Sequence, residues 1–169
     1  MRIIGAVLIF FTAAAAGAYF SGVYSSRCRI LRCIDRMLGK ISAMLRYSAP
    51  PVEDILSAVI REDFISELPF IINIREKTQT DTDFRRVWRE CLDEWNSLSH
   101  IGREEYEILC DLGNDLGASG LESQLENIAA QREHISDIIT QAENDRRTKG
   151  KLCRSMGVLA GIGAVLVLL

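Results

Sequence analysis

The residues of this chain that are best suited to chemistry include several acids that are adjacent in the sequence. Glu104 and Glu105 form one such pair, and Asp93 and Glu94 form another. Two carboxylates perform general acid–base chemistry only when they converge on one substrate. Neighbours in a helix point in different directions, so we expect these acids to be solvated.

The cysteines and histidines do not form a recognisable ligand set. The five cysteines are odd in number and contain no CxxC pair, which argues against a disulfide framework and a metal site. They are Cys28, Cys33, Cys91, Cys110 and Cys153. We expect reduced thiols that mostly pack in apolar surroundings. His100 and His134 have no Cys or Asp constellation around them and are expected at the surface.

A glycine-bearing stretch, residues 112–120, has two possible interpretations. A phosphate-binding loop would need a preceding strand and a Lys-Ser/Thr pair, and the stretch has neither. A helix end assisted by glycine is therefore the favoured interpretation. The chain also lacks an HExxH motif, and no GxGxxG motif follows a strand. We predict no catalytic, cofactor-binding or metal site, and hence no enzyme.

The elements that carry these residues are predicted to be helices throughout. Apolar residues at spacings of three and four predict helices over 27–47, 52–60, 84–95, 104–116 and 121–148. Residues 80–83 (Thr-Asp-Thr-Asp) form a cap signal. Pro69 should break or start a helix within 64–76. The expected fold is an all-α bundle of about five or six helices.

Two of these helices contain further candidate features. In the last, the expected heptad positions are Leu121, Leu125, Ile128, Ile135, Ile139 and Ala142, with Arg132 interrupting the seam. Trp88 and Trp95 share one face of their helix. They are either core anchors or part of a contact surface. Together with Asp111 and Asp115 they form the candidate partner-binding set.

Both ends of the chain are apolar. Residues 3–24 contain no charge, and about 20 apolar residues span a bilayer core. Residues 155–169 offer only about 22 Å of helix, with Gly157 and Gly161 at a helix-packing spacing. A cleaved signal peptide is the alternative for the first segment. The arginines that follow it favour a cytoplasmic location instead. The predicted division is two membrane spans, 3–24 and 155–169, around a cytoplasmic domain, 25–154.

Charge divides this domain sharply. Residues 25–46 and 146–154 each carry a net charge of +5, and residues 47–145 carry −14. The basic segments suit anionic headgroups, and the acidic body is a poor nucleic-acid binder. The acids are either ordinary solvated faces or a docking face for a basic partner.

Several motifs taken together resemble a known family, the stage III sporulation protein AB proteins of endospore-forming bacteria. One is Leu45-Arg46-Tyr47 before a proline turn. The others are the tryptophan-bearing helix, an LGxxLG…Q stretch and the glycine-bearing end. That stretch is Leu112, Gly113, Leu116, Gly117 and Gln124. Gly120 stands where the family typically has an acid before the last long helix, so a cap is either lost there or supplied by Ser119.

The resemblance implies a platform or adaptor in the complex that joins mother cell and forespore. Its soluble part would be similar to the F-type platform domains of type II secretion and type IV pilus machines. It would link a cytoplasmic ATPase, the AA member of the complex, to membrane channel components. Membrane lipids are expected as further partners, and oligomers are possible. The alternative is a membrane-tethered sensor or scaffold that binds a ligand or a regulatory protein. A membrane enzyme is the weakest hypothesis.

Overall fold

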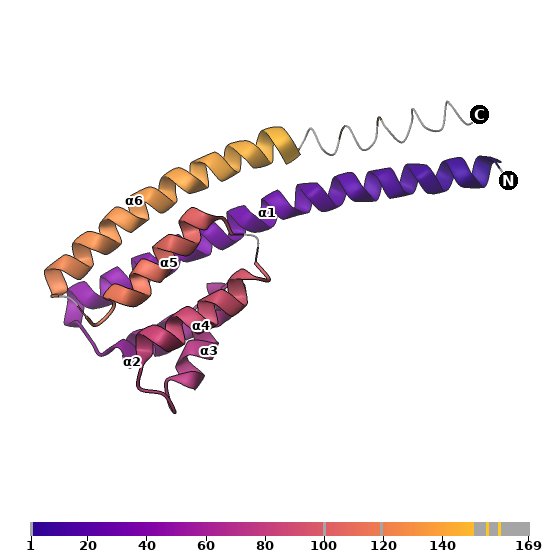
Figure 1. The fold of residues 1–169 in the computed structure, drawn as a ribbon. Coiled ribbons are helices and arrows are strands. Elements are labelled where there is room, and N and C mark those ends of the chain that lie inside the picture. The colour runs from indigo at the N-terminus through magenta and orange to yellow at the C-terminus, as the bar shows by residue number, and fades with distance from the viewer. Residues whose placement is uncertain (1, 100, 119, 151–154, 156–158, 160–169) are drawn as a thin grey trace. The chain divides into compact units, whose positions relative to one another are not determined.

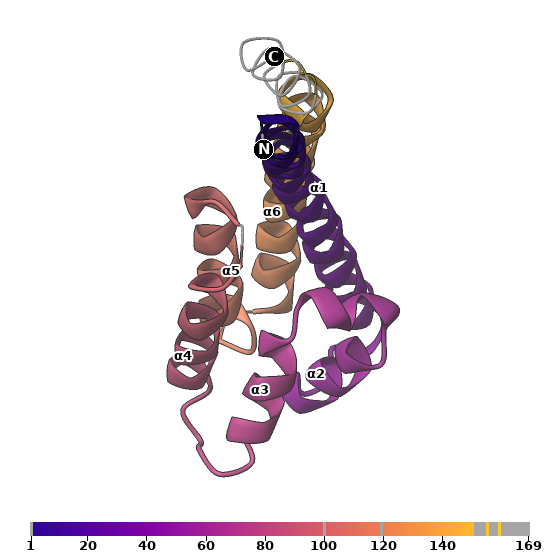
Figure 2. The same cartoon turned by 90° about the vertical axis from the view of Figure 1, so that its right-hand side faces the viewer.

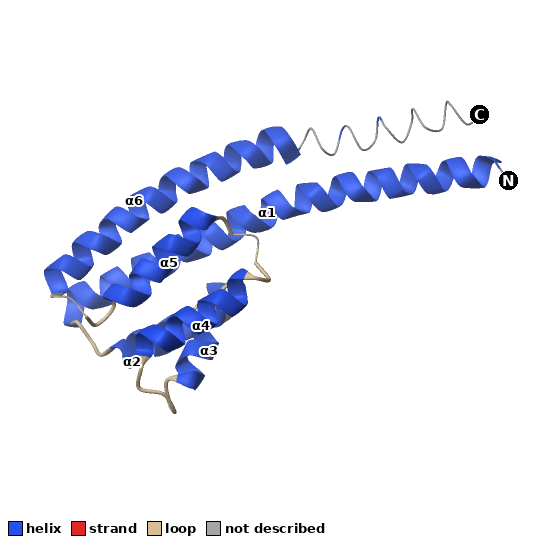
Figure 3. Cartoon of the chain, in the orientation of Figure 1, coloured by secondary structure: helices blue, strands red, loops and turns tan. Residues whose placement is uncertain are grey.

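The computed structural model describes residues 2–99, 101–118, 120–150, 155 and 159, and for residues 2–11, 13–14, 16–21 and 150 it describes the backbone alone. Every regular element in this part of the chain is helical, which confirms the all-α prediction (Figure 3). The chain divides into two compact units. One combines residues 1–28 with 140–169, and the other contains residues 29–139.

The first unit contains the beginning of α1 (Arg2–Ser48) and the end of α6 (Leu121–Asp145). A π-helical turn, Arg146–Gly150, follows α6, and within it Lys149 pairs with Asp145 at 2.9 Å. Among the described residues, no helix has a stretch that is both long and apolar enough to cross a membrane. Residues 157 and 161 lie outside the described part, and so does most of the apolar segment 155–169. The two spans therefore stay predictions.

The second unit contains most of the helices. After α1 come α2 (Val52–Ile60), the 3₁₀-helix η1 (Asp63–Glu67), α3 (Phe70–Lys77), α4 (Phe84–Asn96), α5 (Arg103–Asp115) and α6. Helices that follow one another in sequence are neighbours in space, since α2 packs on α3, α3 on α4 and α4 on α5 (Figures 1 and 2). The described part thus contains six α-helices.

The starts of α2, α3 and α4 are determined by proline and capping residues that can be recognised in the sequence. Pro51 and Pro69 stand directly before α2 and α3, where a missing N–H costs nothing. Asp83 caps α4, and its carboxylate accepts a hydrogen bond from the Arg86 backbone N–H at 3.2 Å. These starts confirm the predicted roles of Pro69 and of the cap signal.

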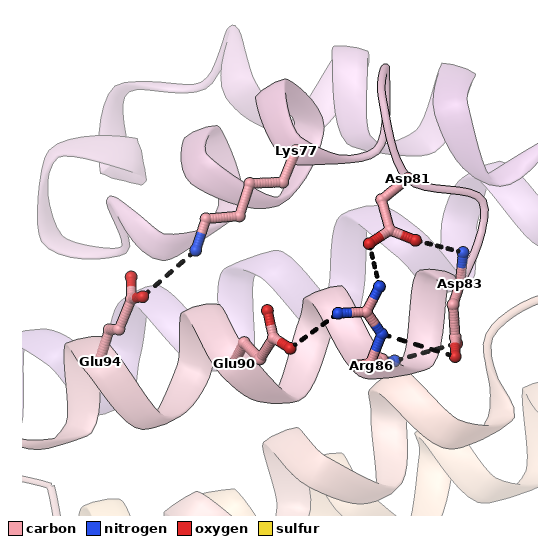
Figure 4. A network of polar contacts seen from close by, with 6 residues as sticks. All are labelled: Lys77, Asp81, Asp83, Arg86, Glu90 and Glu94. Carbon is pink, nitrogen blue, oxygen red and sulfur yellow. Dashed lines mark hydrogen bonds and ion pairs between the residues drawn. The ribbon is translucent and has the colours of Figure 1, made fainter.

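An ion network closes the turn between α3 and α4 (Figure 4). The Arg86 guanidinium pairs with Asp81 and Asp83 on the turn and with Glu90 one helical turn later, at 3.0 Å for Glu90. Asp81 also accepts a hydrogen bond from the Asp83 backbone N–H at 3.0 Å. This bond and the nearby Arg86 hold the pKa of Asp81 below its ordinary value. The turn is thus ordered by charge rather than by apolar burial.

The core runs along one face of α1. Its buried side chains recur at spacings of three and four: Leu31, Ile34, Met37, Leu38, Ile41 and Leu45. Burial of each large aliphatic side chain contributes about 1.5–3 kcal/mol. The expected helix stripe of residues 27–47 is confirmed.

Basic side chains of α1 have carboxylate partners within the second unit. The pairs are Arg29–Glu67 at 2.6 Å, Arg36–Asp63 at 2.5 Å and Lys40–Glu62 at 2.7 Å. The sequence suggested that this basic segment faces lipid headgroups. Acids of η1 and of the turn before it offset part of that charge, and the contact with headgroups stays a prediction.

The buried seam of α6 agrees with the predicted one only in part. Ile128, Ile135 and Ala142 are buried as expected. Of the other predicted positions, Leu121 is 44% exposed, and Leu125 and Ile139 are only half-buried. The buried residues are instead Gln124 and Ile138, each one position earlier than Leu125 and Ile139. Arg132 therefore does not interrupt the seam. It lies beside it, and its Nε donates to Asp35 of α1 at 2.9 Å.

Candidate functional site

Trp88 of α4 lies at the centre of the candidate site. Only 1% of its surface is exposed, and its indole N–H donates to the Leu109 carbonyl of α5 at 2.8 Å. Phe70 of α3 meets the ring edge-on, with centroids 5.9 Å apart. The buried N–H is thus satisfied while the ring joins three helices. This placement supports the interpretation of Trp88 as a core anchor and leaves it little surface for a partner.

Gly113 makes the approach of Trp88 to α5 possible. A Cβ at this position would lie 2.2 Å from Trp88 Cδ1, far inside van der Waals contact. Only glycine lets the indole lie directly against the backbone of α5. The first glycine of the LGxxLG stretch is therefore explained by packing.

Gly117 serves a different purpose in the same stretch. Its φ of +78° is a left-handed conformation that side chains disfavour, and a Cβ here would lie 2.8 Å from Val52 Cγ2. It follows Leu116, the C-cap residue of α5, and turns the chain toward α6. The predicted helix end is confirmed. A phosphate loop does not fit, because the described part contains no strand before this stretch.

The remaining residues of the stretch close the contact between α5 and α6. Leu112, Leu116 and Gln124 are buried, with 1%, 5% and 7% of their surfaces exposed. They line a cavity of about 10 Å³ together with Asp115, Asn127, Ile128 and Gln131. The buried Oε1 of Gln131 has no hydrogen-bond partner among the described residues. The cavity has room for about one water molecule.

The other candidate residues do not join this cluster as a set. Trp95 stacks on Phe70 at 4.9 Å and is 9% exposed, so it is also a core residue. Asp115 is partly exposed and accepts a hydrogen bond from Asn127 Nδ2 at 2.9 Å. Asp111 is exposed. Of the four predicted partner-binding residues, the two aspartates therefore supply the accessible surface.

The expectation that adjacent acids are solvated is wrong for one residue. Glu105 is fully buried, although it stands in the first turn of α5 beside the exposed Glu104. Glu104 lies 3.6 Å from His134, which is exposed as predicted. Asp93 is exposed but accepts a hydrogen bond from the Tyr106 hydroxyl. This bond raises the pKa of Tyr106. His100 lies outside the described residues.

The cysteines behave as the sequence predicts wherever they are described. Cys28, Cys33 and Cys91 are buried free thiols, and Cys110 is half-buried. Burial raises the pKa of Cys33 and of Cys91 above the ordinary value. Such thiols are poor nucleophiles at neutral pH. In the described part, no group of His, Cys, Asp and Glu has the arrangement of a metal site. Cys153 lies outside this part.

Comparison with known proteins decides the family. The family model described as stage III sporulation protein AB matches residues 2–169. The chain belongs to the stage III sporulation protein AB family. It is 23% identical over 171 residues to the "Stage III sporulation protein AB" of Bacillus subtilis (strain 168), an alignment that covers 100% of this chain and 99% of that protein. No solved structure matches.

In this member of the stage III sporulation protein AB family, the LGxxLG…Q stretch is an architectural element. Its glycines admit Trp88 and turn the chain after α5. Its leucines and glutamine fill the contact with α6. Gly120 has open space around it. Residues that contact a partner must therefore be sought on exposed surfaces around this cluster.

Proposed function

We propose that this chain is a non-enzymatic, membrane-tethered platform or adaptor of a sporulation complex. It links a cytoplasmic ATPase, the AA member of that complex, to membrane channel components. Membership of the stage III sporulation protein AB family supports the sporulation role. The resemblance of the soluble part to the platform domains of secretion and pilus machines supports the adaptor role.

Helix α1 is the observation that carries this proposal. It is one helix of 47 residues that begins at Arg2 and ends at Ser48. Its first half coincides with the uncharged segment 3–24, and its second half supplies the main core stripe of the helical unit. No loop separates the two halves. A helix of this composition suits a module held at a membrane by its N-terminus.

The chemistry of the described side chains favours binding over catalysis. The buried thiols have raised pKa values, and the exposed His134 is accompanied by a single acid, Glu104. A catalytic nucleophile needs a general base within hydrogen-bond reach and a group that orients that base. A platform needs only surfaces of defined charge and shape, which a helical bundle supplies.

The alternative, a ligand sensor, would be favoured by a sizeable apolar pocket with converging polar groups. The cavity beside the LGxxLG…Q stretch measures only about 10 Å³. A pocket for a small organic ligand has a volume of about 300–1,000 Å³. The larger hollows, of about 230 Å³ beside Pro50 and Gly117 and of about 490 Å³ along α1, are open to solvent. No enclosed pocket in the described part therefore favours the sensor over the platform.

Topology is tested with a cysteine placed at the surface. Cys91 is unsuitable because it is fully buried, whereas Leu98 is 83% exposed. In intact cells, Leu98→Cys should resist a membrane-impermeant maleimide. After permeabilisation it should be labelled. Labelling in intact cells would refute the cytoplasmic assignment.

The partner is tested by recovering the full chain from membranes of sporulating cells. The ATPase should copurify with the wild-type chain. Asp111→Lys reverses an exposed charge on α5 and should weaken this recovery about tenfold if the acidic face docks the ATPase. Asp137→Lys, on the exposed face of α6, is the matched control. Absence of the ATPase from the wild-type sample would refute the adaptor function.

A further inference from the structure

An open groove runs over the second half of α1 and is not explained by the features described above. It has a volume of about 490 Å³ and is lined by Gly39, Ser42, Ala43, Arg46, Tyr47 and Arg132. The α1 part of its lining combines three small residues with a long basic and an aromatic side chain. All of these residues belong to the second unit.

Arg132 provides hydrogen-bond donors at this groove, and its side chain is already held in place. Its Nε donates to Asp35 at 2.9 Å, which fixes the side chain across α1. The guanidinium lies over Gly39, where a Cβ would be 3.4 Å from Cζ and nearly as close to both Nη atoms. Among the described residues, only the Nε of this guanidinium has a bonded partner. Both Nη groups can therefore donate to a ligand.

Arg46 and Tyr47 add exposed binding groups. Tyr47 is 93% exposed, an unusual position for an aromatic residue of a folded unit. Arg46 is exposed and has no ion-pair partner among the described residues. Among the described residues, no carboxylate lines the groove, although residues 47–145 carry a net charge of −14. The groove is therefore a basic site on an acidic module.

We propose that this groove binds an acidic helical segment of a partner protein. The planar forks of Arg46 and Arg132 suit a carboxylate, which arginine binds with two parallel hydrogen bonds. Ser42 and Ala43 line the groove with small side chains and leave room for a second helix beside the two arginines. Tyrosine and arginine are the residue types that contribute most to protein–protein binding.

The position of the groove along α1 favours a protein over a lipid surface. Arg46 lies about 25 Å along the helix from Arg29, the first residue of this unit. That length exceeds two Debye lengths of about 8 Å at physiological salt. A headgroup layer at the start of the unit would attract Arg46 only weakly.

This inference rests on the proposed function in one respect, because an adaptor needs two contacts. The exposed aspartates on α5 suit a basic partner, and the Arg46–Arg132 groove suits an acidic one. The two surfaces have opposite charge, so two different partners can be held without competing for one site.

The test uses the full chain in membranes of sporulating cells. A photo-crosslinking amino acid replaces Tyr47, and the same amino acid at Leu98, also strongly exposed, is the control. The Tyr47 position should crosslink to an acid-bearing helical segment of a partner, and the Leu98 position should not. Arg46→Glu should reduce this crosslink about tenfold, whereas Arg46→Lys, which keeps the charge but loses the planar fork, should reduce it by a smaller factor.

Exchanging the charges of Arg46 and of its partner carboxylate tests whether the two groups contact each other directly. Replacing the crosslinked segment's carboxylate with arginine should restore the crosslink in the Arg46→Glu chain. Crosslinking to lipid, to a second copy of the chain, or to nothing while the complex still assembles would overturn the proposal, and so would failure of the exchange. Recovery of the ATPase is scored separately. Its absence refutes the adaptor function, while the crosslink reports on the groove alone.

Discussion

The indole of Trp88 lies against the backbone of Gly113, so closely that a Cβ at this glycine would be 2.2 Å from the ring. The same indole donates its N–H to Leu109, one helical turn earlier on α5. Two consecutive turns of α5 thus hold the Trp88 ring, one by packing at Gly113 and the other by the hydrogen bond to Leu109. The distance between α4 and α5 is set by this arrangement, and the exposed Asp111 lies between the two turns in sequence.

Gly113→Ala should therefore lower the free energy of unfolding by about 1–3 kcal/mol, the usual cost of overpacking a core. Thermal unfolding of the full chain in detergent, followed by circular dichroism, measures the change. Gly120→Ala is the matched control, because a Cβ there meets nothing within 4 Å. Equal stability of the two variants would contradict the packing role of Gly113.

Ala49 offers a site where stability can be gained. It follows α1 with a φ of +42°, in the left-handed region that costs residues with a Cβ about 1–2 kcal/mol. Ala49→Gly should relieve this strain and raise the free energy of unfolding by about 0.5–1 kcal/mol, after the entropy cost of glycine. Ala130→Gly, in the exposed middle of α6, should instead lower it by a similar amount. A loss of stability in both variants would show that Ala49 is not strained.

The position of the α6 seam can be tested with two adjacent isoleucines. Ile138 is 3% exposed, and Ile139 is only half-buried. Ile138→Ala should cost about 2–4 kcal/mol and Ile139→Ala about half of that, because less apolar surface and a smaller cavity are involved. Denaturant midpoints of the two variants measure the difference. The reverse order would restore the seam predicted from the sequence.

The turn before α4 should make stability depend on acid pH. Asp81 has a lowered folded-state pKa, chiefly through the Asp83 backbone N–H and also through Arg86. Its contribution is present above the ordinary pKa of 3.8 and is lost as pH falls through the folded value. Asp81→Asn should therefore be less stable than wild type at neutral pH, with a difference that shrinks below about pH 4.

Thermal unfolding of both proteins between pH 3 and pH 7 measures this dependence. Asp137→Asn, an exposed acid on α6, serves as the control and should track wild type throughout. A difference for Asp81→Asn that stays constant down to pH 3 would mean that the carboxylate contributes through something other than its charge.

The sequence predicted the helices well where local rules decide the outcome. The bounds of α2, the start of α3 after Pro69 and the cap at Asp83 agree with the structure, because proline, capping and apolar spacing act within a few residues. The turn at Gly117 follows from the same local chemistry.

Features that depend on distant neighbours were missed. The helix dipole favours an acid in the first helical turn whether the side chain faces water or the core. The local sequence around Glu105 therefore gave no indication that this side chain is buried. The α6 seam was misplaced because the buried Gln124 counts as polar, whereas the exposed Leu121 and the half-buried Leu125 and Ile139 count as apolar. The carboxylate partners of Arg29 and Arg36 lie 38 and 27 residues further along the chain, beyond the reach of any local pattern.

The Arg132–Asp35 pair has a consequence for the order in which the unit is made. The two residues are 97 positions apart. At about 5–20 residues per second, Asp35 is synthesised roughly 5–20 s before its partner. Contacts of α2 with α3, α3 with α4 and α4 with α5 join consecutive helices and need no such wait. We expect pulsed hydrogen exchange during refolding to protect α4 and α5 before α6, and simultaneous protection would refute this order. Until α6 arrives, the side of α1 that it covers is open to chaperones and to early partners.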